Sequence, residues 1–501
     1  MFEAMVQALG NIASPTIWVW VSVGLIAGLL LGILPGISSL TGLTLFLPFV
    51  FRLEPMQALP LMVSMASVGY TAGSITAVLL GIPGEPANAA TILDGFPMTQ
   101  KGEGSRALGA AITASLMGGA VPVFLALAMV WAVMPIIMAV TSMDMVVVIA
   151  AGLVVIGVVA KGAMLKGVIS GGIGLLISSI GLAPMTGVPR FTFDMPYLYD
   201  GLHLSPVAMG LFAVPPMIEL ALEGGESTLA RSGAAAVKGM AGAWEGARDV
   251  FRHWWLWARS SFIGYLFGLM PGVGANSAVW VTYGIAKQSS KHPETFGTGN
   301  VEGVIAPESA NNAKESGALL TTLALGIPGS AGGAIFLAAF IMLGFRPGPS
   351  MLTEQLDLSL TILILVALAN IIAGAICFPV APYLASIARV PGRILVPVVF
   401  VLIFVAAYAS SGQMADIVVL LIFSAVGVAA KRHGYNIPAL FLGYILGELF
   451  EQYLFLGLQL GGPLFFIRPI PLVIIFLVAL FFAYRPLKGA IGSRFGRART
   501  A

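Results

Sequence analysis

The sequence predicts an all-α protein that crosses a membrane many times and is built from two related halves. Two observations support the membrane fold. Hydrophobic residues make up 58% of the 501 residues and charged residues only 9%, whereas soluble domains carry about 25% charged residues. Long apolar runs recur along the whole chain. The roughly ten-residue segments of alternating polarity that are typical of a membrane β-barrel are absent from the sequence. Two pairs of similar segments support the two halves.

Seven apolar runs are candidates for membrane helices. They cover residues 17–34, 107–138, 145–160, 358–378, 394–409, 417–430 and 472–484. With about 20 residues per span, the chain has room for roughly 10 to 13 crossings. The run 107–138 fits either one long helix or two short ones. The segment before the first run contains no Lys or Arg, so we expect a retained helix rather than a cleaved signal.

The distribution of basic residues favours a cytoplasmic C-terminus. Five basic residues follow the last apolar run: Arg485, Lys488, Arg494, Arg497 and Arg499. Basic segments beside membrane spans stay in the cytoplasm. The mixed-charge linker at 223–259 is expected on the same side, with its HWWLW sequence at the membrane interface. Topology explains these charges without any nucleic acid, and the single cysteine, Cys377, excludes a disulfide within the chain.

Two pairs of segments indicate an internal duplication. GLLLGILPGISSLTG is similar to GYLFGLMPGVGANSA, which aligns Gly28 with Gly264. SITAVLLGIPGEPANAA is similar to LLTTLALGIPGSAGGAI, which aligns Gly81 with Gly326. Both pairs occur in the same order at nearly the same offset. We therefore expect two halves, 1–235 and 236–501, with the cytoplasmic linker beginning near residue 223. A pseudo-two-fold axis would relate them, most simply as inverted repeats.

Four Pro-Gly pairs interrupt these apolar segments, at Pro35, Pro83, Pro271 and Pro328. Proline removes a backbone donor and breaks a helix. Such breaks are tolerated in a membrane where the freed groups are buried in protein or face a water-filled cavity. Matched breaks in two halves, as broken helices or re-entrant hairpins, point to a transport site. The alternative is that some only kink helices or allow close packing, as the GxxxGxxxG from Gly24 onward would.

The breaks offer chemistry that suits an anion. A helix that restarts after a break presents free N–H groups and a positive dipole end. Nearby hydroxyl and amide groups would add donors, and glycines would let the backbone come close. The expected substrate-binding residues are Gly36, Ser38, Ser39, Thr41, Gly84, Asn88, Gly272, Asn276, Ser277, Asn311, Asn312, Lys314, Gly329 and Ser330.

A polar cluster, PESANNAKESG, runs directly into an apolar stretch. On a helix with Pro307 in its first turn, one stripe would be formed by Glu308, Asn311, Asn312, Glu315 and Ser316. Polar groups at membrane depth are costly and usually face a partner or a pathway; alternatively, the charges lie in water above the membrane. Lys314 would face a substrate carboxylate or pair with Glu315 or another acid.

A coupling ion needs oxygen ligands or a carboxylate that takes up a proton. The expected coupling-ion residues are Glu85, Glu308, Thr71 and Ser316. Carbonyl groups freed at the breaks could also hold a sodium ion. Asp94 lies in the sequence DGFP, so we expect a turn residue at the membrane edge.

Enzyme chemistry finds little support. The four histidines lack paired metal-ligand spacing, and neither a nucleophile elbow nor a P-loop is present. No organic cofactor is expected. The residues alone leave open a secondary transporter and a passive anion channel, with an intramembrane enzyme as a more distant alternative.

Four motifs resemble the large membrane subunit, of the TctA type, of the tripartite tricarboxylate transporter family. They are LPGISSLTG, GIPGEPANAATILDGFPM, MPGVGANSAVWVTYG and the long segment from PESANNAKESG through GIPGSAGGAIF. The resemblance implies a bacterial inner-membrane symporter for citrate or related carboxylates, driven by sodium or protons. It also implies two partners, a small four-helix membrane subunit of the TctB type and a periplasmic substrate-binding protein of the TctC type.

Overall fold

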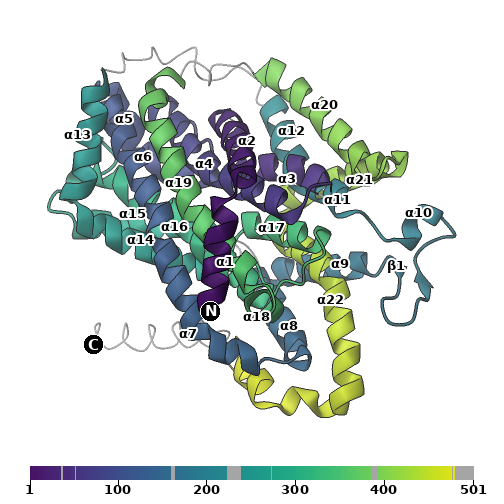
Figure 1. The fold of residues 1–501 in the computed structure, drawn as a ribbon. Helices are drawn as coiled ribbons and strands as arrows, with labels where there is room; N and C mark the ends of the chain where they lie inside the picture. The colour runs from purple at the N-terminus through teal and green to yellow at the C-terminus, as the bar shows by residue number, and fades with distance from the viewer. Residues whose placement is uncertain are drawn as a thin grey trace, which may run out of the picture.

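The computed structural model describes residues 1–34, 38–50, 52–159, 164–222, 239–271, 274–384, 392–476 and 478–479. These residues form a bundle of helices (Figure 1). Their strands are limited to a short antiparallel pair, β1 (Gly181–Leu182) and β2 (Pro189–Arg190). In Figure 1 this pair and the short helix α10 (Pro196–Tyr199) project from the side of the bundle. The expected all-α membrane fold is confirmed.

The first half of the chain contributes the following further helical elements. They are α1 (Phe2–Ala13), α2 (Pro15–Ile33), α3 (Ser39–Val50), α4 (Pro55–Leu80), the 3-10 turn η1 (Pro86–Asn88), α5 (Ala89–Gln100), α6 (Gly104–Ala120), α7 (Pro122–Ala139), α8 (Ser142–Val159), α9 (Met164–Ser178), α11 (Leu204–Ala208), the π turn η2 (Met209–Ala213) and α12 (Val214–Leu222).

The second half contributes another series. It consists of α13 (Gly239–Arg252), α14 (Trp254–Leu269), α15 (Gly274–Ser289), the 3-10 turn η4 (Pro293–Thr295), α16 (Glu302–Leu325), α17 (Ala331–Met342), α18 (Pro349–Thr353), α19 (Leu356–Leu384), α20 (Gly392–Ser411), α21 (Met414–Arg432), α22 (Ile437–Gly461) and the 3-10 turn η6 (Gly462–Ile467).

Seven helical stretches among the described residues are long and apolar enough to cross a membrane. They are Pro15–Ile33, Pro55–Leu80, Gly104–Pro135, Leu204–Leu222, Leu356–Val380, Met414–Arg432 and Ile437–Ile467. Five shorter apolar helices accompany them. The chain is therefore a multi-pass membrane protein, and the number of crossings stays a prediction. The run 107–138 is divided into α6 and α7, which meet at Val121.

Helices α4 and α16 form the centre of the protein. Residues 58–79 of α4 and 303–324 of α16 are all buried. Helix α2 packs along α4, and α14 packs along α16. A helix that is buried on every side must satisfy its polar side chains from neighbouring protein. The polar residues of these two helices therefore mark where the chain brings distant segments together.

Glycines allow the same close packing in both halves. A Cβ on Gly28 of α2 would lie 2.3 Å from the carbonyl oxygen of Met65 on α4. A Cβ on Gly264 of α14 would lie 2.5 Å from that of Ala310 on α16. Gly264 is the residue that the sequence aligns with Gly28, so the two glycines occupy corresponding contacts.

Corresponding glycines also end the two central helices. Helix α4 ends at Gly81 and α16 at Gly326, each with φ of 67°. This left-handed conformation favours glycine, because a Cβ would clash with the backbone. Short helices begin after two of the Pro-Gly pairs: α3 begins at Ser39 after Pro35, and α17 begins at Ala331 after Pro328. Ser39 is buried, and Ala331 is partly buried.

Candidate functional site

Glu85 ties one Pro-Gly break to the start of another helix. Its carboxylate is buried and accepts the backbone N–H of Ser39, the first residue of α3. The N–H of Glu85 itself donates to Asn88 Oδ1 at 3.1 Å. The first N–H groups of a helix have no partner within the helix, so they bind an anion readily. Here the anion is a side chain of the same protein.

A buried lysine lies beside this contact. Lys314 Nζ donates to Asn311 Oδ1 at 3.0 Å, lies 3.5 Å from Glu315 Oε1 and sits 4.4 Å from the centre of the Tyr70 ring. Lys314 and Glu315 are only 3% and 6% exposed. The alternative of charges in water above the membrane is therefore wrong. Of the roles left open for Lys314, the structure shows the pair with Glu315, and the ring face adds a cation–π contact.

Glu308 is a carboxylate with a full set of donors. Its two oxygens accept hydrogen bonds from Ser74 Oγ at 2.6 Å, Asn88 Nδ2 at 3.1 Å, Thr91 Oγ1 at 2.5 Å and Ser115 Oγ at 2.7 Å. The donors come from α4, η1, α5 and α6. Glu308 therefore joins four separate elements to α16. A coupling ion at Glu308 stays a prediction, and an ion there would have to displace some of these donors.

Asn312 makes a second cross-link from α16. Its Nδ2 donates to Thr71 Oγ1 at 3.0 Å and to Asn370 Oδ1 at 2.7 Å. Its Oδ1, and Nδ2 of Asn311, are buried without a hydrogen-bond partner among the described residues. Leaving such a group unsatisfied costs roughly 1–3 kcal/mol. The Asn311 Nδ2 donor and the Asn312 Oδ1 acceptor are therefore available to a bound ligand.

The remaining residues of the expected coupling site, Thr71 and Ser316, make contacts other than those of Glu85 and Glu308. Thr71 belongs to the Asn312 cross-link and also donates to Ser67 O at 3.4 Å. Ser316 donates to the carbonyl oxygen of Ala313 on its own helix at 2.9 Å and is fully buried. The expected single stripe on α16 is thus divided among several neighbouring helices.

Several expected substrate residues shape the helix starts. Ser38 Oγ accepts the N–H of Thr41 at 3.3 Å, as a cap of α3. Ser330 Oγ accepts the N–H of Gly333 at 2.9 Å, as the cap of α17. Ser277 lies half-buried on α15. Ser38 and Ser330 thus cap helices that begin after two of the breaks, and a role of the three serines in substrate binding stays a prediction.

Two expected glycines lie at close backbone approaches. A Cβ on Gly84 would lie 2.8 Å from the carbonyl oxygen of Gly32, and one on Gly329 would lie 2.0 Å from that of Gly268. Any side chain at these positions would push helices apart. Gly36 and Gly272 fall outside the described residues, and so does the side chain of Asn276, whose backbone belongs to α15.

Two local expectations are wrong. Helix α16 begins at Glu302 and not near Pro307, which lies inside it. Asp94 is fully buried in α5 and is not a turn residue. Its carboxylate accepts Tyr283 OH at 2.8 Å and the N–H of Asn300 at 2.8 Å. Because Asp94 anchors the loop just before Glu302, the helix starts there, and Pro307 is accommodated within it.

Sequence reasoning missed several members of this core: Tyr70, Ser74, Thr91, Ser115 and Asn370. For Asn370 a signal existed, since it is a lone amide in the apolar run VALANIIAG. The hydroxyl residues carry no comparable signal, because Ser and Thr are common in membrane helices and often bond to their own backbone.

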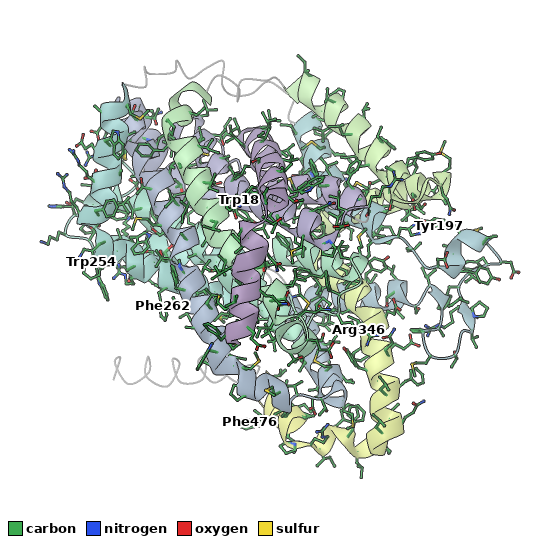
Figure 2. The ribbon with its side chains drawn as sticks, viewed as in Figure 1. Trp18, Tyr197, Trp254, Phe262, Arg346 and Phe476 are labelled. Carbon is green, nitrogen blue, oxygen red and sulfur yellow. The ribbon has the colours of Figure 1, made fainter. Side chains whose placement is uncertain are left out.

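A polar cluster outside the core joins the projecting segment to the bundle. The buried carboxylate of Asp416 accepts Tyr197 OH at 2.6 Å and Ser411 Oγ at 2.5 Å, and lies 2.7 Å from His203 Nδ1. The contact with Asp416 raises the pKa of His203. A cavity of about 810 Å³ opens beside the cluster, between His203, Ser411 and Glu448. Tyr197 lies on the outer side of the bundle in Figure 2.

The described residues contain no group of three or more His, Cys, Asp or Glu side chains placed to hold a metal ion. The core instead combines one buried cation with buried carboxylates and two amides that each have one unpaired atom among the described residues. This arrangement can bind and exchange charged groups, and it resembles a binding site more than a catalytic one.

Comparisons with known proteins identify the family of this chain. The family model for the tripartite tricarboxylate transporter TctA family matches residues 18–442. The chain belongs to the TctA family. It is therefore a component of a membrane transporter, and its family is one of transporters and not of enzymes. The family resemblance carried by the four motifs is confirmed.

Two proteins of Agrobacterium vitis are similar to this TctA-family chain. One, described as an uncharacterized 52.8 kDa protein in the TAR-I ttuC' 3' region, is 30% identical over 441 residues, which cover 88% of this chain and 87% of the relative. The other, an uncharacterized protein in the TAR-II ttuC' 3' region, is 32% identical over 191 residues, which cover 38% of this chain and 79% of the relative. No solved structure matches.

Proposed function

We propose that this chain is the large membrane subunit of a secondary transporter that takes up tricarboxylates or related organic carboxylates. A sodium or proton gradient would drive uptake, in symport. The observation that carries the proposal is the buried start of α3, where Glu85 accepts the Ser39 N–H and interacts electrostatically with Lys314. Lys314 also contacts Asn311, whose Nδ2 donor is unpaired among the described residues. A carboxylate is the ligand class that suits such donors.

The family description supports the proposed partners and location. A tripartite system needs two further components, and we propose the small four-helix membrane subunit and the periplasmic substrate-binding protein implied by the motifs. The complex would lie in the bacterial inner membrane, with the basic C-terminal tail in the cytoplasm.

We propose that the two halves, 1–235 and 236–501, are inverted repeats around this site. The corresponding contacts of Gly28 with Met65 and of Gly264 with Ala310 support the duplication on which this proposal rests. So do the matching left-handed helix ends at Gly81 and Gly326. Binding sites between repeats, formed by interrupted helices, are a recurrent plan of secondary transporters.

Uptake of radiolabelled citrate tests the proposed function. Vesicles should contain the chain together with the small subunit and the binding protein, with and without an imposed sodium or proton gradient. Accumulation that needs one of the gradients is the expected result. Flux that only equilibrates citrate would support the passive anion channel instead. If citrate fails under every gradient, the carboxylate held by the cognate binding protein is the next substrate to measure.

Two amide substitutions test the site. Asn312→Ala removes the hydrogen bonds to Thr71 and Asn370 together with the unpaired Oδ1. Asn276→Ala changes a residue at the start of α15, in the second copy of the duplicated Pro-Gly segment. Each should abolish uptake while the protein is still made in normal amount, as measured by immunoblotting of membranes. Normal uptake by both variants would contradict the site assignment.

A further inference from the structure

The start of α3 is already occupied by an anion. The Glu85 carboxylate accepts the N–H of Ser39, which is the first residue of that helix. Ser38 caps the same turn through the N–H of Thr41, so the helix start is well formed. A substrate carboxylate would seek the same N–H groups. Glu85 therefore stands where part of the substrate would bind.

The charges around Glu85 make the site unfavourable for a second anion. Glu85 faces Ser39 of α3, and it interacts electrostatically with Lys314 and Glu315 of α16. Tyr70 of α4 faces the same carboxylates, and Glu308 also acts on Lys314. One buried ammonium thus faces three buried carboxylates when all of them are ionised. An added negative charge would be uncompensated in a low-dielectric site, which is strongly unfavourable.

The anchoring of Glu85 lets its side chain move without its backbone. Its N–H is held by Asn88 Oδ1, and Asn88 is in turn held by Glu308 and by Ser74 Oγ at 3.2 Å. The contact with Ser39 is the part of this arrangement that a change of side-chain rotamer can break. The carboxylate can therefore leave the start of α3 while the Pro83–Gly84 segment stays in place.

We propose that Glu85 is a tethered carboxylate that holds the substrate's place at the start of α3, and that it gives up this place by taking up a proton. This inference rests on the proposed function. The proton comes from water on the side from which the substrate arrives and adds to a Glu85 oxygen, which removes one negative charge. The substrate carboxylate then accepts the Ser39 N–H. After substrate release the proton leaves to water on the other side, and Glu85 binds Ser39 again.

Proton uptake on citrate binding tests this exchange. Citrate is titrated calorimetrically into the full-length protein in lipid nanodiscs, in two buffers that differ in ionisation enthalpy. After correction for the protonation of citrate itself, the wild type should take up about one more proton per bound citrate than Glu85→Gln. As the pH rises, the citrate affinity of the wild type should also fall by up to about tenfold per pH unit relative to that of Glu85→Gln. Glu354→Gln, at an exposed carboxylate at the end of α18, should behave as the wild type.

If Glu85→Gln fails to fold, a second variant still tests the exchange. Glu85→Asp keeps an ionisable group on a shorter side chain that no longer reaches Ser39. It should still take up the proton, and it should bind citrate about tenfold tighter at neutral pH, because a charge-assisted hydrogen bond no longer competes.

The outcomes separate this inference from the proposed function. Equal proton uptake by the wild type and Glu85→Gln would overturn the inference while leaving carboxylate transport intact. So would binding that needs sodium but no proton. If the wild type binds none of citrate, succinate and malonate and also fails to transport them, the proposed function itself fails, and this inference fails with it.

Discussion

At the scale of single residues, the core is organised by buried carboxylates with different surroundings. Glu308 has four side-chain donors, and Asp94 is held by Tyr283 and by backbone N–H groups. Glu85 instead meets one helix start and a nearby ammonium. A saturated carboxylate stays in place because moving it would leave its donors unpaired. Glu308 and Asp94 thus hold neighbouring elements together in fixed positions, whereas Glu85 is the acid that can change its hydrogen-bond partner.

The role of Glu308 leads to a stability prediction. Glu308→Gln turns one acceptor into an NH₂ donor that faces groups which already donate. Hydroxyls can rotate to accept, but the amide of Asn88 cannot, so we expect a cost of roughly 1–3 kcal/mol and a lower melting temperature of the purified protein.

Thermal unfolding monitored by tryptophan fluorescence measures this effect. The matched control is Glu354→Gln, which makes the same chemical change at an exposed site and should leave the melting temperature unchanged. A Glu308→Gln protein as stable as that control would show that Glu308 does not join these elements.

At the scale of elements, close packing and anchoring depend on a few contacts. The Pro328–Gly329 segment before α17 comes so close to α14 that the carbonyl oxygen of Gly268 fills the space where a Cβ of Gly329 would lie. On the opposite side, the segment from β1 to α10 is attached to α21 through Asp416. The first contact is steric and the second is electrostatic, so they respond to different changes.

A pair of glycine substitutions tests the steric contact. Gly329→Ala would place a Cβ 2.0 Å from the Gly268 oxygen, whereas a Cβ on Gly284 of α15 would meet nothing within 4 Å. We expect Gly329→Ala to abolish uptake and lower the yield of folded protein. Gly284→Ala should be neutral or stabilising by about 0.5–1 kcal/mol, because alanine favours a helix. Equal behaviour of the two variants in size-exclusion profiles and uptake would contradict this packing.

The His203–Asp416 contact predicts a dependence of stability on pH. The pKa of His203 is raised above its ordinary value of 6.5 by its hydrogen bond to Asp416. The charged imidazolium is therefore the form that stabilises the fold. Its contribution is fully present below pH 6.5 and is lost as the pH rises through the raised pKa.

Melting temperatures measured across this pH range test that dependence. The wild type should lose stability as the pH rises, and His203→Gln should show a flatter curve. Because the imidazole is partly exposed, the difference should be modest. A wild-type curve with the same slope as that of His203→Gln would assign the pH dependence to other groups.

At the scale of the whole molecule, the protein buries a polar centre within its apolar core and exposes apolar side chains on its outer helices. Its central helices carry the buried acids, amides and lysine, while Val19, Ile26 and Trp131 on the outer helices are 60%, 62% and 69% exposed. This is the distribution expected of a protein surrounded by lipid, which offers no hydrogen bonds. Trp254 lies at the edge of the bundle in Figure 2 and is exposed, as expected for an anchor at the interface.

The orientation in the membrane can be tested with reporter fusions. Green fluorescent protein attached after Ala501 should fluoresce, because the basic tail is expected in the cytoplasm. Alkaline phosphatase at the same place should be inactive. Both reporters inserted into the 223–238 linker should give the same result. An active phosphatase at either position would reverse the proposed topology.

Much of the fold and part of the site could be predicted from the sequence. Composition and apolar runs determined an α-helical membrane protein, and the Pro-Gly motifs predicted helix starts, which the structure places at Ser39 and Ala331. The motifs also identified the family. The start of α16 and the place of Asp94 were predicted wrongly, because a carboxylate in α5 anchors the loop before α16.

What the sequence by itself determined was local: hydrophobicity, helix breaks and the polar character of the PESANNAKESG segment. These follow from neighbouring residues, because burial in lipid and the geometry of proline act within one segment. Only the tertiary structure decided that Glu85 meets the start of α3, that Lys314 lies against the ring of Tyr70, and that Glu308 gathers four donors. Those partners come from separate elements of the fold, and only packing brings them into contact.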